Sequence, residues 1–190
     1  KVCKRAGIRV IMITGDNAIT AQAVARELNL RDKVLTGEQL EKLNKNDLKH
    51  AVRKIDIYAR VNPEHKVKIL EALQENGEIV AMTGDGINDA PALKRSDVGI
   101  AMGISGTDVS KESADMILLD DNFNSIVQAI KHGRRIFDNI KKFVKLLLSA
   151  NFGEIGIIFA SLIAGLPLPL LPLQILWINL ITDSLPAVAL

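Results

Sequence analysis

Two short segments combine residue types that suit phosphate and metal chemistry. Thr14, Gly15 and Asp16 follow one apolar run, and residues 82–91, which read Met-Thr-Gly-Asp-Gly-Ile-Asn-Asp-Ala-Pro, close another. Each segment places a hydroxyl, a glycine and a carboxylate where a strand would lead into a helix. Glycine permits close backbone approach there, and a helix start favours an anion. Both segments therefore suit a phosphate together with a divalent cation.

Three charged side chains complete this candidate site. Asp85 and Asp89 supply the oxygens that Mg2+ prefers, and Lys66 offers a fixed positive charge for a phosphoryl oxygen. A simpler alternative is that Asp16 and Asp89 only cap helices. The combination of both loops with Lys66 favours a phosphate and magnesium site.

A second group of polar residues stands in the otherwise apolar C-terminal part of the chain. Its five oxygen-bearing members are Asn151, Glu154, Asn179, Thr182 and Asp183. The first two are three residues apart, so they share a helix face, and the last three are grouped likewise. An ionised carboxylate at the bilayer centre costs about 2.5–3.5 kcal/mol, so such residues seldom persist without a partner. An oxygen-only set with two carboxylates suits a hard cation, and Pro186 would free the Thr182 carbonyl as a further ligand. The alternative is that Asn and Thr join the helices while Glu154 is protonated.

The elements that must position the first site alternate along the chain. Short apolar runs occupy 9–13, 57–60, 78–82, 98–102 and 116–119, and helical spacing occupies 18–28 and 63–76. This alternation predicts an α/β domain with a parallel sheet flanked by helices. Ligands collect at the carboxyl ends of such strands, where both loops lie.

Charge divides the chain into two parts. Residues 1–142 carry 23 of the 24 Lys and Arg residues and 20 of the 22 Asp and Glu residues. Residues 143–166 form a 24-residue, mostly apolar run, longer than the roughly 20 residues that span a bilayer. A shorter run at 173–190 follows a proline-rich turn at 165–172, which predicts a transmembrane helical hairpin rather than a buried core hairpin. The basic residues before the first run place 1–142 on the cytoplasmic side.

The composition argues against a nucleic-acid-binding protein and against a small scaffold held together by disulfides or zinc. The 24 basic and 22 acidic residues give a net charge of +2, with no sign of a basic surface for nucleic acid. The single cysteine, Cys3, closes no intrachain disulfide and builds no cysteine-rich zinc site.

The sequence resembles the P-type cation-transporting ATPases, whose phosphorylation domain has a haloacid dehalogenase-like fold. The resemblance implies ATP and Mg2+ as cofactors. The residues that match the family's phosphate and magnesium motifs are Thr14, Gly15, Asp16, Lys66, Asp85, Asn88 and Asp89. It implies that Asp85 holds the metal, with Asp89 also in the Mg2+-binding motif, and that Asn88 and Asp89 orient the loop.

The apolar part resembles one branch of the family more than another. Residues 149–154 and 177–187 look like the fifth and sixth transmembrane helices of the sarcoplasmic-reticulum type of calcium pump, at the positions that bind Ca2+. The sodium-potassium type is similar over 108–123 but departs at 177–183. The resemblance therefore implies Ca2+ transport, with a Na+/K+-type or other cation pump as the alternative.

The family's nucleophile is missing from this sequence. It is the aspartate of an Asp-Lys-Thr-Gly-Thr motif on the central strand, and residues 32–36, Asp-Lys-Val-Leu-Thr, match it only by coincidence. We expect a partial sheet that lacks this strand and exposes unpaired edges, and a chain that does not phosphorylate itself. A soluble phosphatase of the same superfamily would share the phosphate residues without needing the hairpin, and a channel or scaffold would not need the magnesium loop.

The expected organisation has three parts. Residues 1–122 form the carboxyl-side part of the phosphorylation domain, 123–142 a stalk helix and 143–190 the transmembrane hairpin. The implied partners are the lipid bilayer and the rest of the pump, namely its nucleotide-binding and actuator domains and other transmembrane helices. The glycine-rich stretch 99–106 suggests a phosphate loop, but an ordinary connection is favoured.

Overall fold

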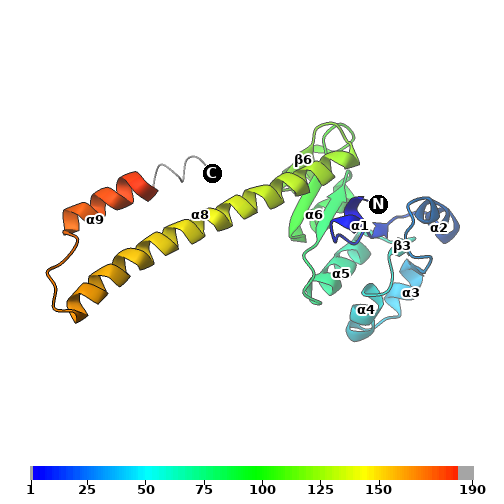
Figure 1. Cartoon of the computed structure of the whole chain (residues 1–190). Coiled ribbons are helices and arrows are strands. Elements are labelled where there is room, and N and C mark those ends of the chain that lie inside the picture. The colour runs from blue at the N-terminus through cyan, green and yellow to red at the C-terminus, as the bar shows by residue number, and fades with distance from the viewer. Residues whose placement is uncertain (1, 184–190) are drawn as a thin grey trace. The chain divides into compact units, whose positions relative to one another are not determined.

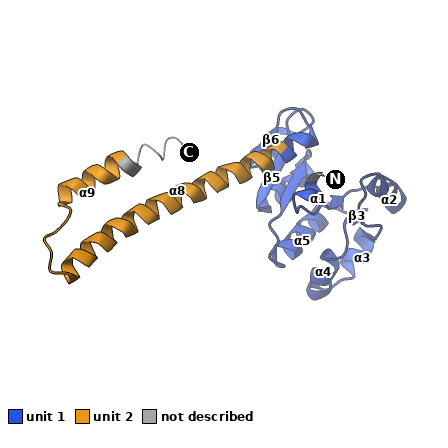
Figure 2. Cartoon of the chain, viewed as in Figure 1, with its two compact units in different colours: residues 1–127 blue, residues 128–190 orange. Residues whose placement is uncertain are grey.

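The computed structural model describes residues 2–183 and contains two compact units, 1–127 and 128–190 (Figure 2). The predicted boundaries at 122 and 142 both fall at or within one long helix, and they stay predictions.

The first unit alternates strands and helices along the chain (Figure 1). Its elements are α1 (Val2–Arg5), β1 (Met12–Ile13), α2 (Ala18–Glu27), β2 (Val34–Thr36), α3 (Gly37–Glu41), α4 (Lys45–Val52), β3 (Ile57–Ala59), α5 (Pro63–Gln74), β4 (Ala81–Gly84), the 3-10 turn η1 (Ile87–Asp89), α6 (Ala90–Arg95), β5 (Val98–Met102), α7 (Asp108–Glu112) and β6 (Met116–Leu118). All strand pairs are parallel, so the predicted α/β class is confirmed.

The strands form two separate sheets rather than one. The first has the order β1-β3-β2, and the second has the order β4-β5-β6. Among the described residues no strand pairs with the outer edge of β1 or of β4. The two strands that lead into the candidate phosphate loops are therefore edge strands of different sheets, which agrees with the expected absence of a central strand.

The core of the first sheet is built around β3, which is buried along its length. Ile57 and Ala59 face Ala21 and Ala25 of α2, whereas Tyr58 faces the opposite way, into the cluster formed by α4 and α5. Alternate residues of a strand point to opposite faces, so helices cover both sides. This explains why residues 57–59 read as a continuous apolar run, which ends at the exposed Arg60.

Several short elements carry no clear periodic signal in the sequence. The helices α3, α4, α6 and α7 have five to eight residues, too few for two full apolar repeats. The sequence pattern does not predict strand β2, and β4 begins at Ala81 rather than at residue 78. The bounds of β4 are set by its parallel pairing with β5, which runs from Ala81–Val98 to Gly84–Ala101. This pairing joins residues that are distant in the sequence.

Helix α8 (Phe123–Ile163) is a single helix of 41 residues, which runs through the segment 123–142 expected to be helical and on through most of the first apolar run. Among the described residues, it is the one helix that is both long enough and apolar enough to cross a membrane. After a turn come α9 (Pro172–Ile178) and the π-helical turn η2 (Asn179–Asp183). The second span stays a prediction, and Pro186 lies outside the described residues.

The buried carboxylate of Asp56 provides a test of this core. Asp56 is 5% exposed, its Oδ1 accepts from Arg9 Nε at 2.6 Å, and Arg31 Nε lies 3.5 Å from its Oδ2. We expect Asp56→Asn to lower the free energy of unfolding of the 190-residue chain in detergent by about 1–3 kcal/mol, because the acceptor loses its charge. Chemical denaturation followed by circular dichroism measures this change.

Asp32→Asn is the matched control. Asp32 pairs with Arg26 at 3.6 Å, but its side chain is 67% exposed. We expect its free energy of unfolding to change by less than about 0.5 kcal/mol. Equal losses in the two variants would contradict the role given to Asp56.

Candidate functional site

The loop after β4 is organised by Asp89. This residue is 6% exposed, and its Oδ1 forms an ion pair with Lys66 Nζ. Its Oδ2 lies 3.4 Å from the Asp85 amide nitrogen and 3.5 Å from that of Gly86. A buried carboxylate needs such partners, so the loop is held against α5.

The position of Lys66 is fixed by the start of α5. Asn62 caps this helix: its Oδ1 accepts from the His65 amide at 2.8 Å, and His65 Nδ1 accepts from the Asn62 amide at 3.3 Å. Pro63 occupies the first turn, where its fixed φ suits a helix. His65 is 4% exposed, so the residue next to Lys66 is anchored in the core.

The loop after β1 is held by backbone bonds to β3 and the segment after it. The Thr14 amide donates to the Tyr58 carbonyl at 2.9 Å, and the Arg60 amide donates to the Asp16 carbonyl at 2.8 Å. Thr14 Oγ1 lies 3.1 Å from both the Asp16 amide nitrogen and Asp16 Oδ2. Gly15 and Asp16 are exposed. The loop therefore presents the Asp16 carboxylate to solvent, with the half-buried Thr14 hydroxyl beside it.

The two aspartates do more than cap the helices that follow them. Asn17, not Asp16, caps α2, and its Oδ1 accepts from the Thr20 amide at 2.9 Å. Asp89 precedes α6 but makes no side-chain cap hydrogen bond to that helix. The capping alternative is thus excluded only for α2 and α6, because Asp89 Oδ2 does lie 3.5 Å from the Gly86 amide at the start of η1, and the role of both aspartates in a phosphate site stays a prediction.

The predicted phosphate residues form two groups. Lys66, Asp85 and Asp89 are joined around the β4 loop, whereas Thr14 and Asp16 belong to the β1 loop. Within residues 2–183, no described hydrogen bond or ion pair links the two groups. Both lie at carboxyl ends of parallel strands, as expected, but on different sheets.

The β4 loop fits a magnesium ion with few protein ligands. Residues 2–183 contain no cluster of three or more His, Cys, Asp or Glu side chains arranged for a metal. Mg2+ commonly keeps several waters and takes one or two carboxylates plus phosphate oxygens. Asp85 and Asn88 are exposed, whereas Asp89 is engaged by Lys66. Asp85 is thus the carboxylate open to a metal, and Asp89 orients its loop.

Two polar atoms of the apolar helices are shielded from solvent and unpaired. They are Oε1 of Glu154 in α8 and Oδ1 of Asn179 in η2, and neither has a hydrogen-bond partner among the described residues. Leaving a buried acceptor unsatisfied costs about 1–3 kcal/mol. Asn151 is exposed, and the side chains of Thr182 and Asp183 lie outside the described part of the chain.

Arg60, whose backbone is bonded to the β1 loop, was not identified as a candidate site residue from the sequence. Arg60 follows β3 with a φ of 50° and lines a cavity of about 400 Å3 at the carboxyl ends of β2 and β3. The other residues lining this cavity are Thr36, Gly37, Glu38, Glu41, Asn62 and His65. A non-glycine residue in the left-handed region is uncommon and is set by its surroundings.

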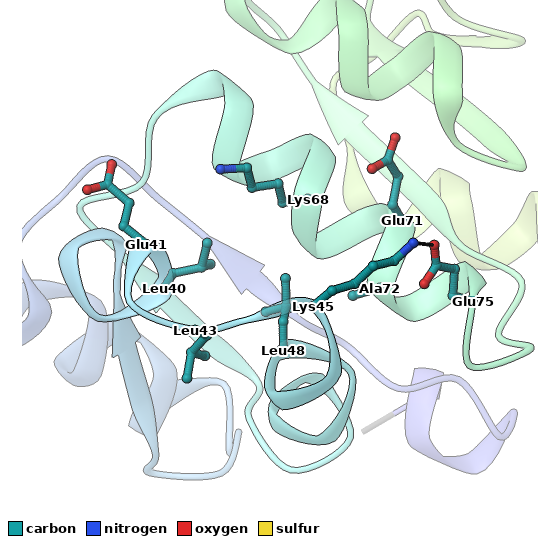
Figure 3. Close-up of a pocket in the computed structure, with 9 residues that line it drawn as sticks. All are labelled: Leu40, Glu41, Leu43, Lys45, Leu48, Lys68, Glu71, Ala72 and Glu75. Carbon is teal, nitrogen blue, oxygen red and sulfur yellow. Dashed lines mark ion pairs between the residues drawn. The ribbon is translucent and has the colours of Figure 1, made fainter.

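Another cavity, of about 300 Å3, is lined mainly by residues of α3, α4 and α5 (Figure 3). Leu40, Leu43 and Leu48 contribute apolar surface, and Lys45 Nζ pairs with Glu75 Oε1 at 2.6 Å. None of the predicted phosphate or metal residues lines it.

Residues 103–106 of the glycine-rich stretch 99–106 form a connection after β5, as favoured from the sequence, whereas residues 99–102 belong to β5 itself. The backbone amides of Gly103, Ile104 and Ser105 donate to the carboxylate of Asp121. The chain itself therefore supplies the anion that a phosphate loop would take from a ligand.

The chain combines a parallel α/β topology, a Thr-Gly-Asp loop, and a lysine paired with the last aspartate of an Asp-Gly-Ile-Asn-Asp loop. Together these features indicate the class of protein to which it belongs. Residues 1–97, and separately residues 66–130, match haloacid dehalogenase-like hydrolases. The chain belongs to this family. Residues 167–190 match the C-terminus of cation-transporting ATPases, and within the class the chain is a part of a P-type cation-transporting ATPase.

Curated relatives agree along the whole chain. A calcium-transporting ATPase of Bacillus subtilis (strain 168) is 53% identical over 193 residues, covering 100% of this chain and 22% of the relative. The endoplasmic reticulum calcium ATPase srcA of Aspergillus fumigatus is 48% identical over 197 residues, covering 100% of this chain and 20% of the relative. The chain thus spans roughly a fifth of the length of these relatives.

Solved structures give the same class. A zinc-transporting PIB-type ATPase in the E2.Pi state superposes with a TM-score of 0.67 at 32% identity, covering 98% of this chain and 24% of that protein. The catalytic domain of the CPx-ATPase CopB-B superposes with a TM-score of 0.52 at 33% identity, covering 68% of this chain and 41% of that domain.

The ion pair between Lys66 and Asp89 predicts a stability difference between two neighbouring lysines. Lys66→Met leaves the buried Asp89 carboxylate without its counter-charge, so we expect the free energy of unfolding to fall by about 3–5 kcal/mol. Lys68→Met is the control, because Lys68 lies on the same helix and is exposed. Thermal unfolding of the chain in detergent compares them, and equal stability would contradict the anchoring role of the pair.

Proposed function

We propose that this chain forms the carboxyl-side part of the phosphorylation domain, the stalk and two membrane helices of an ATP-driven calcium pump. In such a pump, formation and hydrolysis of an aspartyl phosphate drive ion transport. The observation that carries the proposal is the Lys66–Asp89 pair, which presents Asp85 beside a strand end in a chain that also contains a helix long and apolar enough to cross a membrane. The identity to calcium-transporting ATPases supports Ca2+ as the transported ion.

The phosphate chemistry divides among this chain's own residues. Phosphoryl transfer depends mainly on positioning and on neutralising charge. Thr14, Gly15 and Asp16 would form the loop that binds phosphoryl oxygens, and Lys66 would add its positive charge. Asp85 would hold Mg2+, with Asn88 and Asp89 orienting the loop. Bound there, Mg2+ supplies charge neutralisation between a carboxylate nucleophile and the phosphate.

The nucleophile would come from a strand outside this chain. The free edges of β1 and β4 belong to the strands that lead into the two phosphate loops. A parallel strand paired with both would join the two sheets and place its own carboxyl end between the loops. This arrangement explains how Thr14 and Lys66, which no described bond connects, would act on one phosphate.

The transported cation would bind between the apolar helices. The proposed ligands are Asn151, Glu154, Asn179, Thr182 and Asp183. The shielded, unpaired oxygens of Glu154 and Asn179 support this site, because a cation would satisfy acceptors that protein groups leave unmet.

The proposed pump is a multi-pass membrane protein with residues 1–142 in the cytoplasm. Six Lys and Arg residues lie between residues 128 and 145, ahead of the apolar part of α8, and only neutral residues occupy the turn after it. Its partners are the lipid bilayer and the remaining parts of the pump. A soluble phosphatase is disfavoured because α8 exposes apolar side chains along its length.

The absence of a nucleophile predicts no phosphorylation of this chain by itself. Incubation in detergent with Mg2+ and labelled ATP or acetyl phosphate should give no acid-stable phosphoenzyme. The intact pump, assayed in parallel, should give one that depends on Ca2+. An acid-stable phosphoenzyme on the isolated chain would contradict the proposed assignment of the nucleophile.

The cation site predicts a change in ion affinity when Glu154 loses its charge. In the intact pump, we expect Glu154→Gln to raise the Ca2+ concentration for half-maximal phosphorylation at least about tenfold, equivalent to roughly 1.4 kcal/mol of lost binding. Phosphorylation titrated with Ca2+, Mn2+ and Na+ measures affinity and selectivity.

Ser161→Ala is the control for this experiment. Ser161 is also on α8, but its Oγ donates to the Ile157 carbonyl of its own helix at 3.0 Å. We expect its Ca2+ dependence to match that of the unaltered pump. An unchanged Ca2+ dependence in Glu154→Gln would remove this residue from the site.

A further inference from the structure

The carboxylate of Asp121 joins two segments that are distant in sequence. Its Oδ1 accepts from the amides of Gly103 at 2.7 Å and Ile104 at 3.0 Å, and its Oδ2 accepts from the Ser105 amide at 2.7 Å. Asp121 lies two residues before α8, whereas the three amides follow β5. The start of the long helix is therefore tied to the loop at the carboxyl end of the second sheet.

The local backbone is shaped to make this contact. Asp121 has a φ of 48°, in the left-handed region that non-glycine residues rarely adopt. Its amide donates to the Leu118 carbonyl at 3.2 Å, which closes the turn after β6. The backbone hydrogen bonds lower the pKa of Asp121 to about 2, so the carboxylate is ionised at physiological pH.

The same loop is bonded to the proposed magnesium loop at its other end. The Thr107 amide donates to the Asp85 carbonyl at 2.9 Å. Ser110 is fully buried, and its Oγ lies 3.2 Å from that carbonyl and 2.7 Å from the Thr107 carbonyl. Residues 103–107 thus connect the backbone of Asp85 with Asp121, which lies two residues before α8.

We propose that Asp121 is a positioning residue that couples the Asp85 loop to the first turn of α8 through residues 103–107. This role deepens the proposed pump function and rests on it. A shift of the Asp85 backbone would move Thr107 and the loop, and the loop would carry Asp121 and the helix start with it.

The contact is suited to transmitting displacement because it is charged and has three donors. Hydrogen bonds to an ionised acceptor are shorter and stronger than neutral ones, and they resist separation. Backbone donors also move with the main chain rather than through side-chain rotation. The loop and the helix start therefore shift together instead of sliding past each other.

The neighbouring Asp120 has a different set of contacts. Its Oδ2 accepts from Ser125 Oγ at 2.8 Å, and its Oδ1 accepts from the Asn122 amide at 3.1 Å. Both donors lie at the start of α8, and none lies in the 103–107 loop. Asp120 therefore stabilises the helix start locally, which makes it the matched control.

The experiment compares three variants of the intact pump: Asp121→Asn, Asp121→Gly and Asp120→Asn. Asparagine tolerates the positive φ but has one acceptor oxygen and no charge, and glycine removes the side chain while relieving the backbone. The readouts are the amount of phosphoenzyme formed from ATP and the number of Ca2+ ions transported per ATP hydrolysed. We expect both Asp121 variants to form phosphoenzyme while the ratio of ions to ATP falls at least twofold. Asp120→Asn should keep the ratio of the unaltered pump.

Hydrogen exchange supplies a second measurement that does not depend on transport. With Mg2+ and beryllium fluoride as the phosphate analogue, peptides covering 99–107 and 120–127 should change their exchange together in the unaltered pump. In Asp121→Asn only the first peptide should respond, and its amides should exchange about tenfold faster, since a hydrogen bond to a charged group contributes on that order to an equilibrium constant.

A parallel fall of phosphorylation and transport with an unchanged ratio would overturn the coupling role, because it would indicate a general loss of stability. A normal ratio in both Asp121 variants would overturn it as well. If the unaltered pump formed no Ca2+-dependent phosphoenzyme, the proposed function would fail instead, and the exchange experiment would still test the connection between the two segments.

Discussion

The ion pair between Lys66 and Asp89 is the constraint on which the candidate phosphate site depends. Asp89 is nearly inaccessible to water, so its carboxylate requires a counter-charge and hydrogen-bond donors. Meeting this requirement holds the loop after β4 against the first turn of α5 and leaves Asp85 exposed. Lys66 therefore has two connected roles, anchoring the loop and presenting positive charge beside it. The position of the proposed metal ligand follows from the burial of its neighbour.

Within the described part of the chain, each of the two sheets has an edge strand that lacks a hydrogen-bonding partner on one side. β1 and β4 each have an unpaired edge, and each leads into a loop suited to phosphate. Exposed strand edges readily pair with another strand. The chain spans roughly a fifth of the length of its calcium-transporting relatives, so a pump of that size has ample further sequence to supply one. In the proposed pump, a strand from another part of the protein would satisfy both edges and bring the two loops to one substrate.

The apolar helices also contain buried polar atoms that lack hydrogen-bond partners within residues 2–183. Glu154 and Asn179 each place an oxygen out of reach of water without a described hydrogen-bond donor. A cation satisfies such oxygens more completely than a neutral donor, because several can bind it at once. α8 runs without interruption from the residues after β6 into this apolar region. The contacts of Asp121 concern the first turn of that helix, where a change at the phosphate site would reach it.

The sequence by itself determined the chemical residue types, the parallel α/β class and the long apolar helix, because each depends on local composition or spacing. It identified Thr14, Lys66, Asp85 and Asp89, but it left open whether the aspartates cap helices. Only the tertiary structure decided that the strands form two sheets, that Asp89 pairs with Lys66 and that Asp121 occupies the glycine-rich loop. The last two contacts join residues 16 to 23 positions apart. Their partners are chosen by how the chain packs, which no local pattern encodes.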